Sequence, residues 1–467
     1  MRTRADFPMM LGATKLDIWR AKWAGPEAIN ARQHRRLTDL LAFARLHSPF
    51  YRERFADIAG PGGGFAAIPP VTKAMLMDRF DDVVTDPAVT RAGIDTFLAD
   101  QGNIGRRYRG RYPVWTTSGT TGDPGVFVQD ELSLMLVRAV PRRWTAPALL
   151  TPAMLARLVR NGMHGAEIAV TGGHFAGAAG IALIQRESRF LGPRIRMISP
   201  KRQLDDLVDE LNAWQPAFIT GYSTVLVELA RAQRQRRLSI SPAMIVVSGE
   251  PISTDSKREL RQVFGCVVRE MYGATEAVPL AVECDRGSVH LNSDWFVLEP
   301  VDSDYRPVKL GEMSHTVLLT HLGNRVQPLI RYDLGDSVRM RADPCRCASG
   351  FPVIEVEGRQ GDVLWFRGPH DRQVPIFPLA LTSVVEAVPS VTRCQIVRTG
   401  ELSVEVRFDL VADADRMSTW SRVRDALQRF FAGQGVPGAT IEQAVERPAR
   451  NPRSGKFRHV WTERRAQ

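Results

Sequence analysis

The sequence predicts an α/β protein with a large N-terminal domain of parallel-rich sheets and helices, a β-rich subdomain, and a small α+β C-terminal domain. Between about residues 203 and 271, stripes typical of amphipathic helices alternate with short apolar runs. From about 287 to 366 the chain becomes a series of short apolar runs broken by Gly, Pro and Asp. The C-terminal part combines an alternating segment at 402–410, a helical pattern at about 417–431 and a polar end.

The alternating part of the chain predicts parallel strands joined by crossover helices. Strands are expected at 217–220, 244–247 and 267–271, each preceded by a helical pattern, at 204–211, 224–235 and 254–263 respectively. These strands end in Gly221-Tyr222-Ser223, Ser248-Gly249-Glu250-Pro251 and Tyr272-Gly273-Ala274-Thr275-Glu276. Because ligands bind beyond the carboxyl ends of such strands, the three ends predict one shared site.

Other elements are expected outside this region. In chain order they are a helix at 27–47 that ends at Ser48-Pro49, a helix at 134–140, a strand-like run at 167–177, and strands at 316–320 and 326–330. The run at 167–177 ends in a turn that contains His174. Two readings of this histidine stay open, a side chain that faces a ligand pocket and a structural residue.

Composition limits the class of protein. The chain has 467 residues, 44% of them hydrophobic and 24% charged, which is typical of a soluble globular protein with more than one domain. We expect no membrane association and a cytoplasmic location, because no apolar run approaches about 18 residues and no secretory signal is evident. The net charge of +11 favours an anionic substrate such as ATP over nucleic acid, since the arginines are scattered and no nucleic-acid motif occurs.

The stretch Thr116–Gly125 is rich in hydroxyl side chains and glycine. Glycine lets the backbone approach a ligand, and successive N–H and hydroxyl donors can converge on anionic oxygens. The apolar segment Tyr112–Trp115 before it is typical of a strand that leads into the loop. The loop is therefore a candidate phosphate-binding loop, with a flexible turn as the alternative.

Five motifs occur in order along the chain, namely the loop at 117–124, Tyr272–Glu276, Arg331–Asp336, Gly358–Asp362 and Gly455-Lys456. Together they resemble the adenylate-forming superfamily of acyl-CoA synthetases, adenylation domains and luciferase, and most of all its phenylacetate–CoA ligase branch. The segment Ser48–Phe55 also resembles that branch. Each motif alone is common, whereas five in this order over about 340 residues are a specific signal.

The resemblance implies a two-step reaction and two domains. A carboxylate attacks the α-phosphorus of ATP to give an acyl-adenylate and pyrophosphate, and a nucleophile, commonly the thiol of coenzyme A, then displaces AMP. The implied large domain covers residues 1–358 and binds ATP and the acid. A small mobile domain at 359–467 would carry Lys456, whose ammonium neutralises charge developing between the carboxylate and the α-phosphate.

The resemblance also implies the site residues. The phosphate loop would use Thr117, Ser118, Gly119, Thr120, Thr121 and Gly122. The adenine and ribose would be bound by Ser248, Gly249, Glu250, Pro251, Tyr272, Gly273, Asp336 and Arg359. The acid would contact Tyr222, His174 and Ala274. The catalytic residues besides Lys456 would be Thr275, at the α-phosphate, and Glu276, as a ligand of Mg²⁺.

Four of these residues also have simpler interpretations. Asp336 suits the two ribose hydroxyls because one carboxylate can accept two hydrogen bonds, but it follows a glycine as turn residues do. Tyr272 would stack on adenine or belong to the core, and Glu276 is otherwise a surface carboxylate. Lys456 alone would be read as a solvated charge.

The chain departs from the superfamily pattern at two places. Pro124-Gly125-Val126 replaces the common Pro-Lys-Gly, a loss that also occurs in the phenylacetate–CoA ligase branch. The charge of the triphosphate must then be balanced by loop donors, Mg²⁺ and Lys456. Gly361 stands where an acidic residue is usual, which weakens the expectation of a hinge.

A second hypothesis concerns the cysteines. Cys284 and His290 are close in sequence, and Cys345 and Cys347 lie in a later loop of the same predicted β region. Three thiols and one imidazole form a tetrahedral zinc set, and some relatives in the branch look similar here. The alternative is separate free thiols, as expected for the remaining Cys266 and Cys394.

Three functions remain in contention at the level of sequence. The first is an acid–CoA ligase, for which the family resemblance alone implies an aromatic acid. The second keeps adenylation but passes the acyl group to an amine, a hydroxyl or a carrier protein. The third is a catalytically silent nucleotide-binding regulator, against which Glu276, Asp336 and Lys456 argue. A homodimer is left open, and a P-loop kinase is excluded because its motif is absent.

Overall fold

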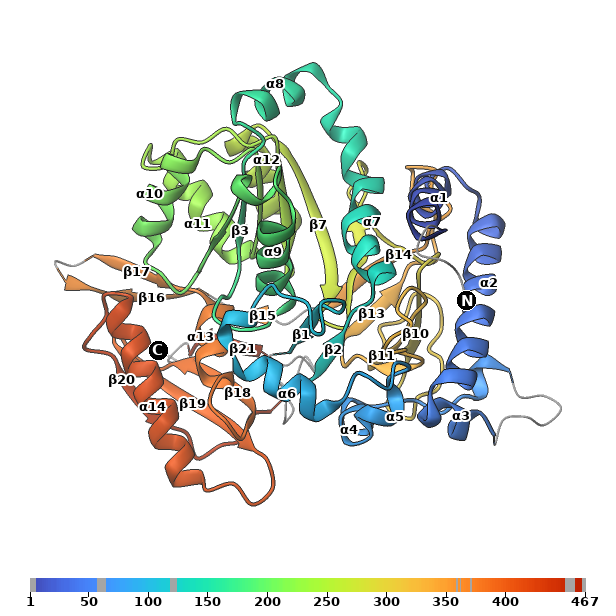
Figure 1. Ribbon diagram of the computed structural model, residues 1–467. Helices are drawn as coiled ribbons and strands as arrows, with labels where there is room; N and C mark the ends of the chain where they lie inside the picture. The colour runs from blue at the N-terminus through green and yellow to red at the C-terminus, as the bar shows by residue number, and fades with distance from the viewer. Residues whose placement is uncertain are drawn as a thin grey trace. The chain divides into compact units, whose positions relative to one another are not determined.

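The computed structural model describes residues 6–56, 64–117, 124–357, 360–361, 363–369, 372–449 and 458–463. The chain forms two compact units (Figure 1). Unit 1 comprises residues 1–115, 126–151 and 269–358, and unit 2 comprises 116–125, 152–268 and 359–467. The expected division into 1–358 and 359–467 is a different partition and stays a prediction. No helix among the described residues is long and apolar enough to cross a membrane.

The N-terminal part of unit 1 is helical. Its helices are α1 (Asp6–Ala21), α2 (Pro26–His47), α3 (Pro49–Ala56), α4 (Lys73–Asp78), α5 (Phe80–Val83), α6 (Arg91–Ala99) and α7 (Glu131–Leu149), with 3-10 turns at Phe65–Ala67 and Gln101–Asn103. The expected helix at 27–47 is confirmed as α2, which ends at Ser48. The helix expected at 134–140 is much longer, because Asp130 caps α7 by accepting a hydrogen bond from the Ser133 N–H at 2.9 Å.

Short antiparallel strands form the rest of unit 1, as the broken texture of 287–366 predicts. They are β8 (Ala277–Glu283), β9 (Val289–Leu291), β10 (Phe296–Val301), β11 (Thr316–His321), β12 (Tyr332–Asp333), β13 (Ser337–Met340) and β14 (Val353–Glu357). β10, β11 and β12 make one sheet, and β13, β14, β9 and β8 follow one another in another. The expected strand at 326–330 is wrong. Pro328 offers no N–H, and the Ile330 N–H donates to the hydroxyl of Tyr51.

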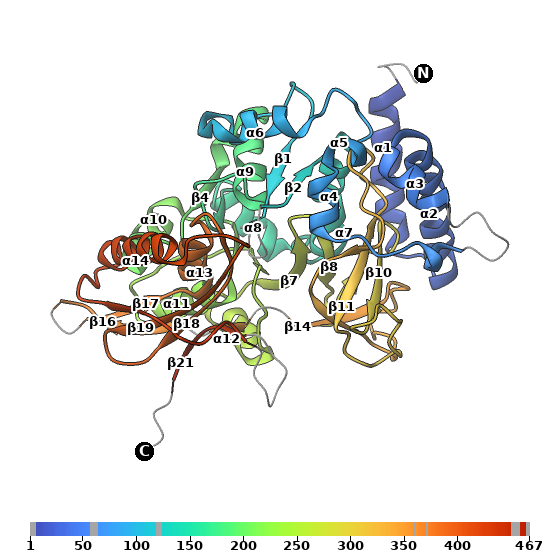
Figure 2. The same ribbon diagram turned by 90° about the horizontal axis from the view of Figure 1, so that it is seen from below.

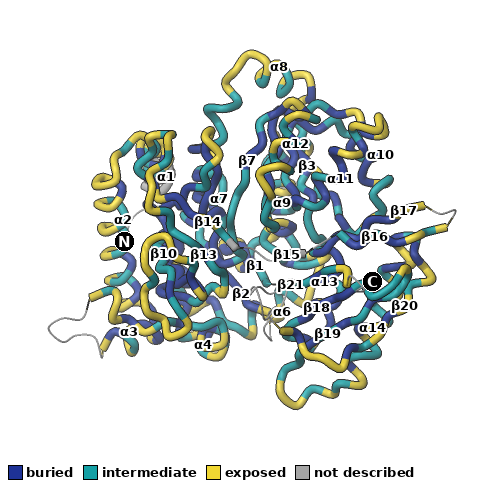
Figure 3. The backbone as a smooth tube through the Cα atoms, turned by 180° about the vertical axis from the view of Figure 1, so that it is seen from behind, coloured by how far each residue is buried: buried dark blue, intermediate teal, exposed yellow. Residues whose placement is uncertain are grey.

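Unit 2 contains the expected parallel sheet. Its strands are β3 (Gly165–Ile168), β4 (Ile195–Ile198), β5 (Phe218–Gly221) and β6 (Met244–Ser248), in the order β6-β5-β3-β4. Its helices are α8 (Pro152–Arg160), α9 (Ala176–Glu187), α10 (Leu204–Trp214), α11 (Ser223–Arg234) and α12 (Thr254–Phe264), with a 3-10 turn at Gly192–Arg194. Apolar residues of α10, α11 and α12 pack on one face of this sheet. Much of α8 is exposed (Figure 3).

The C-terminal part of unit 2 has its own α+β arrangement. Its elements are β15 (Gln360–Gly361), β16 (Leu364–Arg367), β17 (Gln373–Ile376), α13 (Pro378–Glu386), β18 (Val391–Arg398), β19 (Ser403–Leu410), α14 (Arg416–Gly433), β20 (Thr440–Gln443) and β21 (Arg458–Thr462). The sheet order is β15-β21-β18-β19-β20, and α13 and α14 lie together beside it (Figure 2). A separate apolar core joins these elements, including Ile396, Val406 and Phe431.

The chain passes from one unit to the other at five places, among them three in or beside strands. β1 (Val114–Thr116) and β2 (Val126–Val128) pair on either side of the candidate phosphate loop. β7 (Val267–Ala274) begins in unit 2 and continues into unit 1, where it pairs antiparallel with β8. The sequence motifs at 117–124 and 272–276 therefore lie at the places where the chain passes from one unit to the other.

Candidate active site and candidate zinc centre

In unit 1 the structure brings Tyr272 and Asp336 together. Tyr272 lies near the end of β7, and Asp336 directly precedes β13. The Tyr272 hydroxyl donates a hydrogen bond of 2.7 Å to Oδ2 of Asp336. Burial, together with the charge of Asp336, raises the pKa of Tyr272 well above its usual range, so the phenol keeps its proton and donates. A hydrogen bond thus joins the two residues expected at adenine and ribose. The sequence did not predict this bond.

Glu276 is fixed by a tyrosine that sequence reasoning missed. It lies in the turn between β7 and β8, after Gly273, Ala274 and Thr275, and its side chain is buried. The Tyr332 hydroxyl donates to Oε1 of Glu276 at 3.0 Å. Burial and then the charge of Glu276 raise the pKa of Tyr332, which keeps it a donor. Tyr332 lies inside the motif at 331–336, which could have marked it as a candidate site residue. Its partner Glu276, however, is 56 residues away in the sequence.

Arg331 in the same motif has a structural role. Its backbone φ is +50°, and its side chain is buried. Nε donates to Oε2 of Glu299 at 3.0 Å, and Nη1 donates to the carbonyl oxygens of Ala66, at 2.7 Å, and Ile68. This network ties the 3-10 turn at 65–67 to β10 and β12. The motif therefore begins with Arg331, which holds neighbouring segments together, and ends with the hydrogen-bond acceptor Asp336.

In unit 2 the base of the candidate phosphate loop is closed by two hydrogen bonds. The Thr117 N–H donates to the Gly125 carbonyl at 3.0 Å, and the Gly125 N–H donates to Oγ1 of Thr117 at 2.8 Å. The Thr116 N–H donates to the carbonyl oxygen of His174 at 2.8 Å, so the loop base adjoins the turn after β3. Ser118, Gly119, Thr120, Thr121 and Gly122 lie outside the described residues, as do Arg359 and Lys456.

The ends of β5 and β6 meet at Tyr222 and Gly249. Gly249 has φ +80°, and a Cβ there would lie 2.9 Å from a ring carbon of Tyr222, so only glycine fits. The Tyr222 hydroxyl accepts a hydrogen bond from the Val170 N–H at 3.1 Å, which joins the end of β3 to the same place. Of the three strand ends predicted to share one site, those of β5 and β6 therefore meet here, together with the end of β3, which was not among the three.

One oxygen of the Glu250 carboxylate is held by hydrogen bonds within unit 2. Its Oε2 accepts hydrogen bonds from the Thr224 N–H at 3.0 Å, the Thr224 hydroxyl at 2.8 Å and the Ser223 hydroxyl at 3.1 Å. It therefore caps the N-terminus of α11. The carboxylate holds the Ser248–Pro251 loop in place, which leaves the backbone of that loop as the part that can line a nucleotide pocket.

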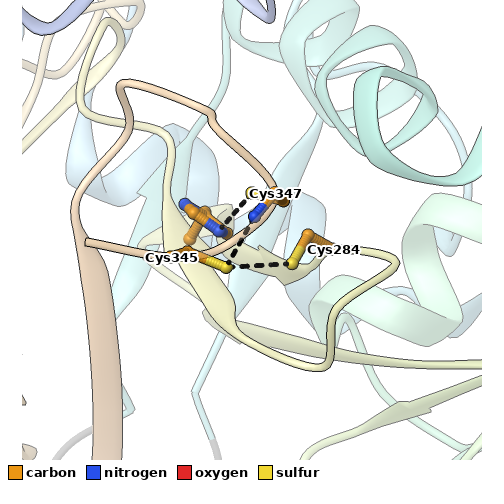
Figure 4. Close-up of side chains that lie close together, drawn as sticks. Cys284, Cys345 and Cys347 are labelled. Carbon is orange, nitrogen blue, oxygen red and sulfur yellow. Dashed lines mark hydrogen bonds between the residues drawn. The ribbon is translucent and has the colours of Figure 1, made fainter. Parts of the chain in front are cut away.

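The structure also gathers the four residues of the zinc hypothesis in unit 1 (Figure 4). The ligand atoms of Cys284, His290, Cys345 and Cys347 all lie within 4.8 Å of one another. The sulfur atoms of Cys284 and Cys345 are 3.8 Å apart, and Sγ of Cys347 is 3.3 Å from Nε2 of His290. A tetrahedral zinc ion with Zn–S bonds of about 2.3 Å separates its sulfur ligands by about 3.8 Å. The spacing fits a zinc ion and is too long for a disulfide.

The surroundings of this cluster fit a metal as well. Nδ1 of His290 faces the carbonyl oxygen of Phe351 at 2.8 Å, which directs Nε2 toward the thiols. Trp144 stacks on the imidazole with ring centroids 4.8 Å apart. The ammonium of Lys22 lies within electrostatic range of Cys284 and Cys347, where it would offset the net negative charge of three thiolates on Zn²⁺.

Comparisons with known proteins agree with this architecture. Residues 188–302 match the model of the AMP-binding enzyme family. The chain is 26% identical over 470 residues to the phenylacetate–coenzyme A ligase of Thermus thermophilus, covering 93% of this chain and 96% of that one. It is 27% identical over 164 residues to protein CapK of Staphylococcus aureus, covering 34% and 35%. Its fold is similar to that of 2-hydroxyisobutyryl-CoA ligase, with a TM-score of 0.58 at 19% identity over 96% of this chain and 92% of that one.

The chain is thus similar to adenylate-forming enzymes, through the AMP-binding region at residues 188–302 and a fold like that of an acyl-CoA ligase. Over most of its length its sequence is similar to that of a phenylacetate–coenzyme A ligase. The expected α/β fold is confirmed.

Proposed function

We propose that this protein is an AMP-forming acid–CoA ligase. It activates a carboxylic acid with ATP to an acyl-adenylate, releases pyrophosphate, and transfers the acyl group to coenzyme A. The observation that carries the proposal is the Tyr272–Asp336 hydrogen bond beside the turn that holds Glu276, in a chain similar over 93% of its length to a phenylacetate–coenzyme A ligase. A silent regulator has no need of this pre-oriented set of acceptors together with Lys456.

The acceptors of unit 1 have complementary tasks. Asp336, held by Tyr272, accepts the two ribose hydroxyls. Glu276, oriented by Tyr332, offers a buried carboxylate oxygen of the kind that Mg²⁺ prefers, and Thr275 donates to the α-phosphate. When bound, Mg²⁺ would supply positive charge to the phosphate oxygens. Because these groups are fixed before substrate arrives, they stabilise charge without reorganising.

The remaining assignments rest on the family resemblance. The loop residues Ser118–Gly122 grip the β- and γ-phosphates, Arg359 contacts ribose or phosphate, and Lys456 acts at the α-phosphate during adenylation. The acid is aromatic and contacts Tyr222, His174 and Ala274. An acceptor other than coenzyme A, such as an amine, a hydroxyl or a carrier protein, is the second candidate for the transfer step.

We further propose that Cys284, His290, Cys345 and Cys347 bind a structural zinc ion. The ion would join the β8–β9 hairpin to the loop between β13 and β14. The support is the distances within the cluster and the hydrogen bond that orients His290. The four residues would form a closed site of the kind that structural zinc ions occupy, with no ligand position left open for substrate.

The test is ATP–pyrophosphate exchange across a panel of aromatic and aliphatic acids, followed by product analysis with and without coenzyme A. We expect exchange with at least one acid and a thioester only when coenzyme A is present. Pyrophosphate exchange with an acyl-adenylate that can be trapped as a hydroxamate, but without a thioester, would favour an acceptor other than coenzyme A. An absence of exchange with every acid would overturn the proposal.

A further inference from the structure

The parallel sheet of unit 2 carries a carboxylate on the face opposite its apolar core. Ala166 and Ile168 of β3 join the core formed with α10, α11 and α12. Strand alternation places Glu167 on the opposite face. It is in register with Thr220 of β5, which is in register with Val246 of β6. Glu167 is the second-last residue of β3, so a carboxylate lies at the edge where ligands of such sheets bind.

This carboxylate is poorly compensated. The hydroxyl of Thr220 hydrogen-bonds to it, and within the described part of the chain no cation interacts with it. Burial raises the pKa of Glu167 to about 7. Glu250, after β6, has three donors on Oε2, while its buried Oε1 has no partner among the described residues. Glu167 is half-buried, so a ligand that covers its carboxylate without offering a donor removes water from it at a cost in free energy.

The groups around Glu167 leave its oxygen uncovered by a side chain. Gly177 lies in the first turn of α9, and a Cβ built there would be 3.9 Å from Oε1 of Glu167. Tyr222, whose hydroxyl is anchored on the Val170 N–H, lies close enough for the charges of Glu167 and Glu250 to raise its pKa, after burial. A donor group of a ligand can therefore approach Glu167 from the side of Gly177.

Glu167 is also placed where it could contact the end of an acid substrate that is remote from the reacting carboxylate. The turn after β3 contacts the base of the candidate phosphate loop through the bond from Thr116 to His174. An acid whose carboxylate faces that loop would direct its other end along the turn toward β3. Glu167 would then meet the substituent, away from the reacting carboxylate.

We propose that Glu167 is a specificity residue that selects acids with a hydrogen-bond donor, a hydroxyl or an ammonium group, at the end remote from the carboxylate. The inference rests on the proposed function and narrows its substrate class. The carboxylate accepts the donor's proton in a hydrogen bond, and no bond forms or breaks. An unsubstituted acid of the same size leaves Glu167 buried without a donor and is disfavoured.

The experiment compares matched acids of equal size by ATP–pyrophosphate exchange. The probes are 3- and 4-ethylbenzoate, the corresponding hydroxymethylbenzoates and the corresponding aminomethylbenzoates. We expect wild type to favour at least one donor-bearing acid over its ethyl counterpart by about tenfold or more in kcat/KM. In Glu167→Gln that ratio should fall about tenfold. The hydroxymethyl and aminomethyl arms distinguish a neutral from a cationic donor.

Two further variants show whether a change in the ratio comes from the site or from misfolding. Gly177→Ala places a methyl group beside Oε1 at ordinary contact distance in a helix, where alanine is favourable, and should lower the ratio at least about threefold. Glu228→Gln is the control, because burial also raises the pKa of Glu228 to about 7, yet Glu228 pairs with Arg231 on α11 at 2.6 Å. It should leave the ratio unchanged.

The outcomes separate this inference from the proposed function. Exchange with a preference for the ethyl acids, or a ratio that Glu167→Gln and Gly177→Ala leave unchanged, would overturn the role of Glu167 alone. An absence of exchange with all acids in wild type would overturn the ligase proposal and the inference with it.

Discussion

At the scale of single residues, the site consists of acceptors that partners hold in place. The sequence motifs singled out Tyr272, Glu276 and Asp336 as candidates, because each lies within a short recognisable pattern. They did not identify the Tyr272–Asp336 and Tyr332–Glu276 bonds, since these join residues 64 and 56 positions apart. Local pattern predicts which residue type stands at a strand end, whereas its hydrogen-bond partner depends on how distant segments pack.

Replacing Tyr272 by phenylalanine tests the first of these bonds. Tyr272→Phe keeps the ring but removes the 2.7 Å hydrogen bond that orients Asp336. A hydrogen bond to a charged group contributes about 1.5–3 kcal/mol, so KM for ATP should rise about 10- to 100-fold in pyrophosphate exchange. Tyr305→Phe is the matched control, since Tyr305 donates a similar 2.8 Å bond to Asp333 from an exposed position and should change KM little. Equal KM values for the two variants would contradict the role of Tyr272.

His321 gives a prediction about stability and pH. It is buried at the end of β11, neither ring nitrogen has a hydrogen-bond partner among the described residues, and burial lowers its pKa from 6.5 to about 3. The unfolded chain binds a proton below about pH 6.5, but the folded chain does not until about pH 3. The contribution of neutral His321 is therefore complete above pH 6.5 and is lost as the pH falls toward 3, by up to about 1.4 kcal/mol per pH unit.

Urea unfolding of wild type and His321→Leu between pH 8 and pH 4.5 measures this effect. The leucine variant should lack the part of the pH dependence that comes from this proton, so its stability relative to wild type should rise as the pH falls. A difference between the two proteins that does not change with pH would show that His321 does not cause it.

At the scale of elements, the sequence predicted the helices and strands whose apolar residues recur at a regular spacing. The parallel strands β5 and β6 and helices α2, α11 and α12 were found because hydrophobic spacing is local. The strand expected at 326–330 failed, because its apolar residues are buried in irregular backbone that bonds to Tyr51. Burial alone does not distinguish a strand from a packed loop, so only the Pro328 at its centre argued against the assignment.

The zinc centre is a prediction about how elements are joined. Purified protein should contain about one equivalent of zinc, and Cys345→Ser should lose it and lower the melting temperature, because one ligand of a closed tetrahedral site is removed. Cys394→Ser is the matched control, since Cys394 is buried in the C-terminal core and its replacement should destabilise the protein without changing the zinc content. Metal analysis with thermal unfolding measures both. Wild type without bound zinc would exclude the centre.

At the scale of the whole molecule, the question is which groups supply the positive charge that the proposed reaction requires. The candidate phosphate loop continues as Pro124-Gly125-Val126 and so lacks the lysine common in the superfamily. Thr117 closes the base of the loop through its hydroxyl oxygen, and the acceptors of unit 1 are themselves anionic. In the proposed reaction, the charge that develops at the α-phosphorus would therefore be balanced by Mg²⁺ and by a cation from elsewhere in the chain. The family resemblance assigns this task to Lys456.

Lys456→Ala should separate the two half-reactions. Adenylation, measured by pyrophosphate release, should fall at least about a thousandfold, because the ammonium that offsets the transition-state charge is lost. Thioester formation from supplied acyl-adenylate and coenzyme A should remain within about threefold of wild type, since pyrophosphate no longer takes part in that step. Lys309→Ala, at an exposed lysine in unit 1, should change neither rate. Equal losses in both half-reactions would mean that Lys456 supports the fold or the shared binding of AMP, and undiminished pyrophosphate release would remove it from the active site.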